Sequence, residues 1–413
     1  MDIWIVEIGE PLPIEEGQRL LRYGCFSTYL LDNGHNVRWW TSGFSHQTRQ
    51  HVVSEPAEIN HNGVILDVIP GRGYQSSISL QRVLHQKEFA NDFARIARTR
   101  KRPDAVIATV PSPEIARQVA EYCEWAGVPM ILDIRDQWPE ELVDLAPTGM
   151  GWLVRIALHG MYRDMSFACR TASAICSVSN NFLEYALSFA KRPRSDLDFV
   201  FPLGYEGRAR YSPEELDEAM AVWKERGVRE DHAVCCFFGA IGKYFQLEPI
   251  IEAARRLQGR EEVQFVLCGK GVLDEHFRTL SSDCKNIIWP GWVAGVEVAA
   301  LMKLSDIALA PYRADAKMQM PNKLFEYMSG QLPIVSSLTG EMAQLLDDNQ
   351  CGLNYDANDS VAFEQRILQL VNDPERRVKM GLRGHELFSS KYTFDIVFKN
   401  AMNSIQAVVQ KNF

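Results

Sequence analysis

Residues 306–336 read DIALAPYRADAKMQMPNKLFEYMSGQLPIVS. An apolar run in this segment ends at Pro311, and a polar loop follows. A helix is then expected over residues 322–330, because Pro321 and Asn322 suit its first turn, and a second apolar run closes the segment. Short apolar runs separated by a helix are typical of the strand–helix–strand units of a parallel sheet.

The start of this expected helix carries groups that suit an anion. The first turn of a helix has backbone N–H groups without an intrahelical partner, and Arg313 and Lys323 lie near it in the sequence. Glu326 follows Lys323 on the same helix face, where its carboxylate can accept two hydrogen bonds from a ribose diol. The alternative is a capped helix on which Lys323 and Glu326 only pair with each other at the surface. The apolar residues expected to face the core are Leu324, Phe325 and Met328.

The same alternation extends through the rest of the chain in two series. Each series predicts one doubly wound α/β domain, and the polar stretch 206–231 is the expected seam between them. Open α/β sheets bind ligands at the carboxyl ends of their strands, so we expect two Rossmann-like domains that face each other across a cleft. The expected strands are 3–8, 37–40, 105–109, 130–134, 175–178, 199–201, 233–238, 264–268, 287–288, 307–310 and 333–335. The expected helices are 18–33, 113–126, 247–257, 296–304 and 322–330.

Composition excludes several classes of protein. The 413 residues are 46% hydrophobic and 23% charged with a net charge of −9, which argues against a disordered chain and against a nucleic-acid-binding protein. No apolar run reaches the roughly 18 residues of a membrane-spanning helix, and the N-terminus resembles a strand rather than a signal peptide. Nine scattered cysteines and nine unclustered histidines predict reduced, buried thiols in a cytoplasmic protein without a metal site.

Three glycine-bearing turns follow expected strands. They contain Gly9 and Gly17, then Gly239 with Lys243, and then Gly269 with Gly271. Glycine allows the backbone to approach a phosphate or a sugar closely. None of these turns matches a dinucleotide-binding or Walker sequence, and each one alone is more typical of a tight connection than of a ligand site.

The second half of the chain resembles the nucleotide-sugar domain of retaining GT-B glycosyltransferases, in particular glycosyltransferase family 4. The first half resembles, less closely, the subgroup of that family that builds bacterial surface polysaccharides. The residues that carry the resemblance in the second half are 238–239, 250–254, 266–271, 291–293, 305–311, 321–330 and 340–341. In the first half they are Gly17, 34–37, 133–140, 177–179 and 202–204.

The resemblance implies an N-terminal acceptor-binding domain at 1–205, with a last helix 396–413 that packs back on it, and a C-terminal donor-binding domain at 206–395. It implies sugar transfer from a nucleotide-diphosphate sugar, UDP-linked, to a glycan or lipid-linked acceptor with retention and without a metal or other cofactor. Cations and N–H groups would stabilise the departing diphosphate, with Lys323 and Arg313 as catalytic residues. The donor-binding set is Gly239, Lys243, Gly269, Gly271, Pro321, Asn322, Lys323 and Glu326.

On the acceptor side, the resemblance assigns Gly17, Arg135 and Asp136. Asp136 would orient the acceptor hydroxyl or the transferred sugar, and its alternative role is to cap the helix that follows Trp138. For Arg135 the alternative is a salt bridge with Asp133 or Asp136.

Some positions depart from the family pattern. Met318 replaces the first of two glutamates, Ala240 and Phe245 replace two cations, and Lys243 is the cation left in that loop. Two rival functions therefore stay open, a GT-B sugar-nucleotide epimerase and an inactive partner subunit.

A further stretch has two interpretations. It either lies on the inner face of a membrane near a lipid-linked acceptor or, as we favour from the sequence, forms a buried helix whose arginines reach solvent. Its apolar residues are Trp152, Leu153, Ile156, Ala157 and Met161, and its arginines are Arg155, Arg163 and Arg170.

Overall fold

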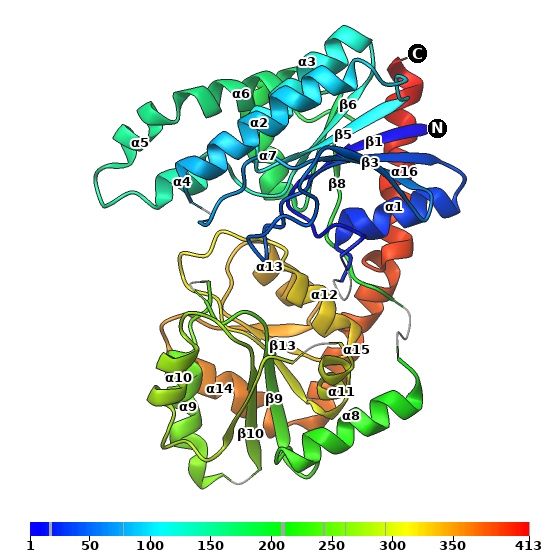
Figure 1. Cartoon of the computed structure of the whole chain (residues 1–413). Coiled ribbons are helices and arrows are strands. Elements are labelled where there is room, and N and C mark those ends of the chain that lie inside the picture. The colour runs from blue at the N-terminus through cyan, green and yellow to red at the C-terminus, as the bar shows by residue number, and fades with distance from the viewer. Residues whose placement is uncertain are drawn as a thin grey trace. The chain divides into compact units, whose positions relative to one another are not determined.

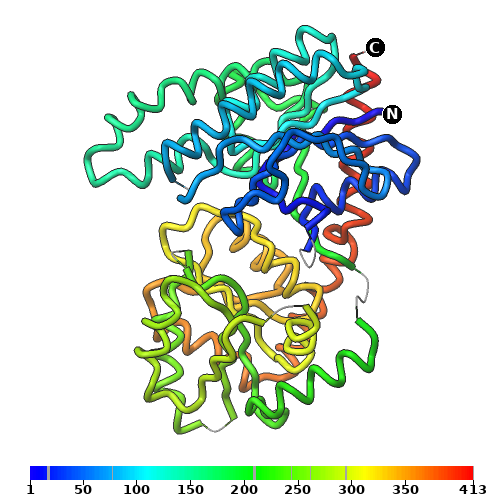
Figure 2. Tube along the Cα trace, in the orientation of Figure 1, coloured from blue at the N-terminus to red at the C-terminus, as the bar shows by residue number. Residues whose placement is uncertain are grey.

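A computed structural model describes residues 1–15, 19–76, 78–207, 211–242, 244–260, 262–293 and 295–412. The chain divides into two compact units. The first consists of Met1–Pro202 with Phe398–Phe413, and the second of Leu203–Val397 (Figures 1 and 2). The expected divisions were at 205/206 and 395/396, so each lies within three residues of the observed one.

The first unit is built on an eight-stranded sheet of order β3-β4-β2-β1-β5-β6-β7-β8. All its neighbouring strands pair in parallel except β3 and β4, which form an antiparallel hairpin. The strand order reverses between β1 and β5, which makes this the switch point where an open α/β sheet binds ligands. The strands are β1 Asp2–Val6, β2 Asn36–Ser42, β3 Ala57–His61, β4 Val64–Ile69, β5 Ala105–Val110, β6 Met130–Ile134, β7 Ala174–Ser177 and β8 Phe199–Val200.

Helices cover both faces of this sheet. On one face α2, α3, α6 and α7 pack in series, and α1 lies on the opposite face (Figure 1). From Phe398 onward α16 belongs to this unit, and the Phe398 ring lies 5.3 Å from that of Phe26 on α1. The helices are α1 Arg22–Asp32, α2 Leu80–Ala97, α3 Pro113–Ala126, α4 Glu140–Asp144, α5 Gly151–Ala157, α6 His159–Thr171, α7 Asn180–Ala190 and α16 Phe394–Asn412.

The second unit has a six-stranded parallel sheet of order β11-β10-β9-β12-β13-β14. Its switch point lies between β9 and β12. The strands are β9 Ala233–Phe238, β10 Val263–Cys268, β11 Ile287–Gly291, β12 Ile307–Ala310, β13 Ile334–Ser336 and β14 Gly352–Asn354. The helices are α8 Pro213–Glu225, α9 Glu248–Arg256, α10 Asp274–Leu280, α11 Val296–Leu304, α12 Asn322–Ser329, α13 Glu341–Asp348, α14 Ser360–Val371 and α15 Pro374–Lys391.

Alternate residues of the central strands enter two separate hydrophobic cores. Cys236 and Phe238 of β9 join the core beside α8, α11 and α12, whereas Cys235 and Phe237 join the core beside α9 and α14. Both faces of these strands are therefore buried, which explains why they read as continuous apolar runs rather than as alternating ones.

The predicted architecture of two doubly wound parallel sheets is confirmed, with three corrections. The hairpin of β3 and β4 and the edge strand β14 were not predicted. The expected seam contains helix α8, which starts with a capping box between Ser212 and Glu215 and buries Trp223. Helix α5, expected to be buried, has no buried residue, because α6 occupies the position against the sheet and takes Met161 into the core.

All nine cysteines are free thiols, and eight of them are buried, as predicted. Within the described ranges, no helix is long and apolar enough to cross a membrane.

Candidate functional site

The first residues of helix α12 meet the end of strand β9 at the switch point of the second sheet. The Lys323 ammonium group donates a hydrogen bond to the carbonyl oxygen of Phe238, the last residue of β9. Its Nζ lies 5.2, 5.5 and 5.3 Å from the ring centres of Phe237, Phe238 and Phe245. Three aromatic faces and a carbonyl therefore hold this cation at the carboxyl edge of the sheet.

The environment of Lys323 weakens its hold on a proton. Burial lowers the pKa of Lys323, and the neighbouring Glu326 opposes that effect. The alternative of a pair made only with Glu326 at the surface does not describe this partly buried lysine, because its ammonium also bonds the last carbonyl of β9. A partly buried cation of this kind is poised to gain from an added anion.

Helix α12 presents its first turn at the same edge. Its N-cap residue is Pro321, which has no side-chain acceptor for the first-turn N–H groups, and Asn322 is exposed. Glu326 is half-buried one turn further along. The opposite face of the helix is buried through Leu324, Phe325, Tyr327 and Met328, which confirms the predicted core face.

The turns after β9 and β10 pack against each other, and their glycines make this close packing possible. A Cβ on Gly239 would lie 2.2 Å from Lys323 Nζ, and one on Gly269 would lie 2.0 Å from the Gly239 carbonyl oxygen. A Cβ on Gly271 would similarly lie 2.0 Å from the Ile241 carbonyl oxygen. These glycines let the turns after β9 and β10 pack against each other and leave room for the lysine.

Arg313 lies in the loop after β12 and is half-exposed. Its Nε donates to Asp315 at 2.9 Å, so it forms a surface ion pair rather than a buried one. In the same loop, Gln319 accepts a hydrogen bond from the Glu341 N–H at 3.0 Å and thereby ties the loop to the start of α13. Met318 packs partly buried against the core.

The first unit gathers charges at its own switch point. Arg135 follows β6, and its guanidinium lies 3.1 Å from carboxylate oxygens of both Glu7 and Glu10, which follow β1. Glu7 also accepts a hydrogen bond from Thr109 of β5. Burial alone would lower the pKa of Arg135, but these two carboxylates outweigh it and raise that pKa. Glu10 accepts the Tyr23 N–H at 2.9 Å, so it also holds the first turn of α1.

The expected partners of Arg135 were therefore wrong, although a salt bridge is present. Asp133 pairs instead with the buried Arg22 and accepts a hydrogen bond from Tyr23 at 2.9 Å. Asp136 does not cap α4, whose N-cap is Pro139 and has no side-chain cap. Burial raises the pKa of Asp136, against the opposing charges of Arg135 and Arg82.

An aromatic and basic group next to Asp136 was not identified from the sequence. The Arg82 guanidinium lies 4.7 Å from the Trp138 ring centre and 5.9 Å from that of Tyr74. His46 Nδ1 lies 2.6 Å from the Tyr74 hydroxyl, and burial lowers the pKa of His46 to about 4. Four separate segments supply these residues, so no local motif marks them. Glu7 could have been identified from the sequence, because it is an acidic residue directly after the buried strand β1.

Two predicted site residues, Gly17 and Lys243, lie outside the described residues. Among the residues that the structure does describe, no three His, Cys, Asp or Glu side chains come together to form a metal site.

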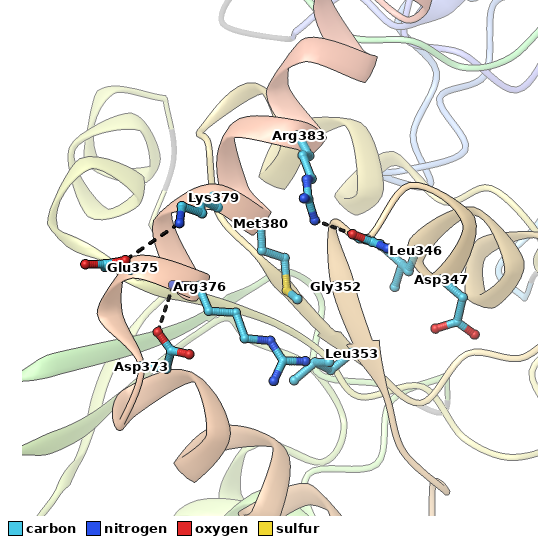
Figure 3. Close-up of a pocket in the computed structure, with 11 residues that line it drawn as sticks. Leu346, Asp347, Gly352, Leu353, Asp373, Glu375, Arg376, Lys379, Met380 and Arg383 are labelled. Carbon is cyan, nitrogen blue, oxygen red and sulfur yellow. Dashed lines mark hydrogen bonds and ion pairs between the residues drawn. The ribbon is translucent and has the colours of Figure 1, made fainter.

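A cavity of about 580 Å³ lies elsewhere in the second unit (Figure 3). Residues of α13, β14 and α15 line it, including Gly352 at the amino end of β14 and the cations Arg376, Lys379 and Arg383. The amino ends of parallel strands lie at the edge of the sheet opposite to the ends that bind ligands. This cavity therefore does not belong to the site formed by Lys323 and Glu326.

Comparison with known proteins gives a consistent assignment of the fold. Residues 232–373 match the family of glycosyl transferases group 1. WcaI of Escherichia coli, by name a putative colanic acid biosynthesis glycosyl transferase, is 23% identical over 65% of this chain and 67% of its own length. EpsD of Bacillus subtilis, a putative glycosyltransferase by name, is 22% identical over 43% of this chain and 46% of its own. These matches span about half to two thirds of the curated relatives.

Solved structures match nearly the whole chain. Anabaena HepE in complex with UDP has a TM-score of 0.69 at 13% identity and covers 98% of this chain and 99% of its own. The sucrose-phosphate synthase of Thermosynechococcus elongatus has a TM-score of 0.73 at 12% identity, covering 99% of both chains. The chain therefore has the GT-B fold, and its residues 232–373 match the glycosyl transferases of group 1.

Proposed function

We propose that this chain is a retaining glycosyltransferase of the family 4 type that acts without a metal ion. It transfers a sugar from a UDP-linked donor to a glycan or lipid-linked acceptor in the synthesis of a surface polysaccharide. The observation that carries this proposal is the partly buried Lys323 ammonium at the start of α12, next to Glu326 and to the close-packed glycine turns.

The donor occupies the carboxyl edge of the second sheet. Glu326 accepts hydrogen bonds from the ribose hydroxyls, and the Gly269–Gly271 turn lies near the base. The diphosphate meets the first-turn N–H groups of α12, together with Lys323. An ammonium has three N–H donors, so its bond to Phe238 leaves donors for phosphate oxygens. Arg313 joins this set if it exchanges its exposed partner Asp315 for phosphate.

The protein needs to supply little to this reaction beyond electrostatic stabilisation of the leaving group. As the bond between the anomeric carbon and the β-phosphate oxygen breaks, negative charge develops on the diphosphate, and a preplaced cation in a partly buried site lowers that barrier. The acceptor oxygen forms its new bond on the same face of the sugar, and its proton passes to the departing phosphate oxygen. Configuration is thereby retained without a protein carboxylate pair of the hydrolase type.

The acceptor binds to the first unit near Asp136, which orients its hydroxyl. Burial raises the pKa of Asp136, which strengthens the affinity of its carboxylate for a donor such as the acceptor hydroxyl, while Arg135 is held between two glutamates. The name of WcaI, which refers to colanic acid biosynthesis, supports a polysaccharide product, and the UDP in the HepE complex supports the choice of nucleotide.

The test is incubation of the full chain with a panel of UDP- and GDP-sugars, with and without glycan acceptors, followed by product analysis. We expect acceptor-dependent release of UDP and a product of retained anomeric configuration. Epimerised donor in the absence of acceptor would replace this proposal with an epimerase. Failure to bind any nucleotide would indicate an inactive partner subunit.

A further inference from the structure

An aromatic and basic group lies at the carboxyl edge of the first sheet, beside the proposed acceptor residue Asp136. It consists of His46 and Arg49 after β2, Tyr74 after β4, Arg82 in the first turn of α2, and Trp138 after β6. We call these five residues the arginine cluster. The loops at this edge of an open α/β sheet are those that hold its ligands, so the arginine cluster is in a position to contact the acceptor.

Two guanidinium groups of the arginine cluster lie against one aromatic ring. Arg49 is 5.1 Å and Arg82 is 5.9 Å from the centre of the Tyr74 ring. Arg82 also lies 4.7 Å from the centre of the Trp138 ring. Contact with a ring face stabilises each cation separately, but it does not remove the repulsion between the two positive charges. An anion bound to both arginines would replace that repulsion with attraction.

Arg82 carries its charge in surroundings that oppose it. Burial lowers the pKa of Arg82 and the charge of Arg49 adds to this effect, whereas Tyr74, Asp136 and Glu114 act in the opposite direction. The first turn of α2 contains no acidic residue, and the positive end of the helix dipole disfavours a cation there. A bound anion would offset the burial, the helix end and the second arginine together.

His46 contributes hydrogen bonds rather than a third positive charge. Burial, together with the charges of Arg49 and Arg82, lowers the pKa of His46 to about 4. Its Nδ1 lies 2.9 Å from Arg49 Nη1 and 2.6 Å from the Tyr74 hydroxyl. Because a guanidinium can only donate, Nδ1 accepts from Arg49 and the ring hydrogen is on Nε2. The imidazole therefore helps to hold Arg49 in place against Tyr74.

We propose that the arginine cluster binds an anionic group of the acceptor, a carboxylate or a phosphate, while Asp136 contacts the hydroxyl that receives the sugar. This inference rests on the proposed function for the identity of the ligand as an acceptor. The planar guanidinium matches the oxygen geometry of both anions. Arg82 lies close enough to Asp136 to lower the pKa of that carboxyl against the effect of burial, so one sugar with an acidic substituent can contact both.

The experiment is titration of the full chain with methyl glucuronide, glucose 6-phosphate and neutral methyl glucoside, followed by ligand-observed NMR. Saturating UDP is present throughout to fill the proposed donor site. We expect at least one anionic sugar to bind about tenfold or more tightly than methyl glucoside. Preference for the glucuronide would identify the carboxylate of an acidic glycan, and preference for the phosphate would identify a phosphate-linked acceptor.

Two variants test whether the arginine cluster makes this contact. Arg82→Met and Arg49→Met should each lower the affinity for the anionic sugar about 10- to 100-fold, because a charged hydrogen bond is lost. The matched control is Arg95→Met, which removes an exposed arginine from the last turn of the same helix and should leave the affinity unchanged. Thermal unfolding monitors the folding of each variant, and Arg49→Met decides the test if Arg82→Met does not fold.

Equal affinity for all three sugars, or no binding of any, would overturn the inference. A fall in thermal stability at unchanged affinity would overturn it too and would assign the arginine cluster to the packing of α2. An equal loss of affinity in Arg95→Met would have the same consequence. Binding of an anionic sugar that depends on Arg82, without transfer from any nucleotide sugar, would instead refute the proposed function and keep the anion site.

Discussion

Replacement of Lys323 by methionine tests the donor site and separates a functional lysine from a structural one. Methionine has a similar length and no charge, so the core beside α12 keeps its volume. The variant removes one hydrogen bond to the Phe238 carbonyl and the contacts of the ammonium with three aromatic rings.

The expected change in stability is small because two effects oppose each other. A hydrogen bond from a charged group contributes about 1.5–3 kcal/mol, whereas relief from burying an ammonium returns several kcal/mol. Burial lowers the pKa of Lys323, which shows that the desolvation effect is present here. We therefore expect the free energy of unfolding to stay within about 2 kcal/mol of the wild type or to rise.

The effect on function should be large. Loss of a charged hydrogen bond to phosphate weakens UDP binding about 10- to 100-fold. Loss of transition-state stabilisation lowers the transfer rate about 10²- to 10³-fold. Calorimetric titration with UDP measures the loss of affinity, and urea denaturation measures the change in the free energy of unfolding. The control is Lys303→Met, an exposed lysine of α11, which should change neither. A Lys323→Met protein that binds UDP normally but is destabilised by more than about 3 kcal/mol would show that the lysine only fastens α12 to β9.

Three other substitutions test other parts of the account. Gly269→Ala places a Cβ 2.0 Å from a carbonyl oxygen and should cost about 1–3 kcal/mol in urea denaturation, whereas Gly259→Ala, with no atom within 4 Å, should cost little; equal costs would contradict the packing of the glycine turns. Asp198→Asn should lower stability by about 1–2 kcal/mol at neutral pH. Although burial raises the pKa of Asp198, hydrogen bonds from Arg192 and backbone N–H groups lower it to about 2, so the stabilisation exists above pH ~4 and disappears as pH falls toward 2. Asp196→Asn is the exposed control, and a pH-independent difference would refute the assignment. Asp136→Asn should slow transfer about 100-fold at unchanged UDP affinity, and an unchanged turnover number would remove Asp136 from the acceptor site.

The fold was predictable where strands are buried on both faces. The continuous apolar runs of β6, β9 and β12 were predicted with the bounds that the structure shows, and helix α3 was too. Strand β3 was missed because its residues alternate between half-buried and exposed positions in a short antiparallel hairpin. The exposure of α5 could not be predicted, since its apolar sequence fits a buried helix equally well.

The arrangement around the start of α12 was easier to predict than the arrangement around Arg135. Lys323 and Glu326 lie on one helix, so their spacing alone places them together. The partners of Arg135 depend on the order of β1, β5 and β6, which brings Glu7 and Glu10 to it from more than 120 residues away. Sequence neighbours such as Asp133 were the natural expectation, and the sheet order overrode it.

A crystal structure of the chain with UDP tests the central claim most directly. The account predicts the diphosphate within hydrogen-bonding distance of Lys323 Nζ and the N–H groups at the start of α12, with the ribose hydroxyls on Glu326. A diphosphate found instead among Arg376, Lys379 and Arg383 of the cavity in Figure 3, with the first turn of α12 untouched, would contradict it.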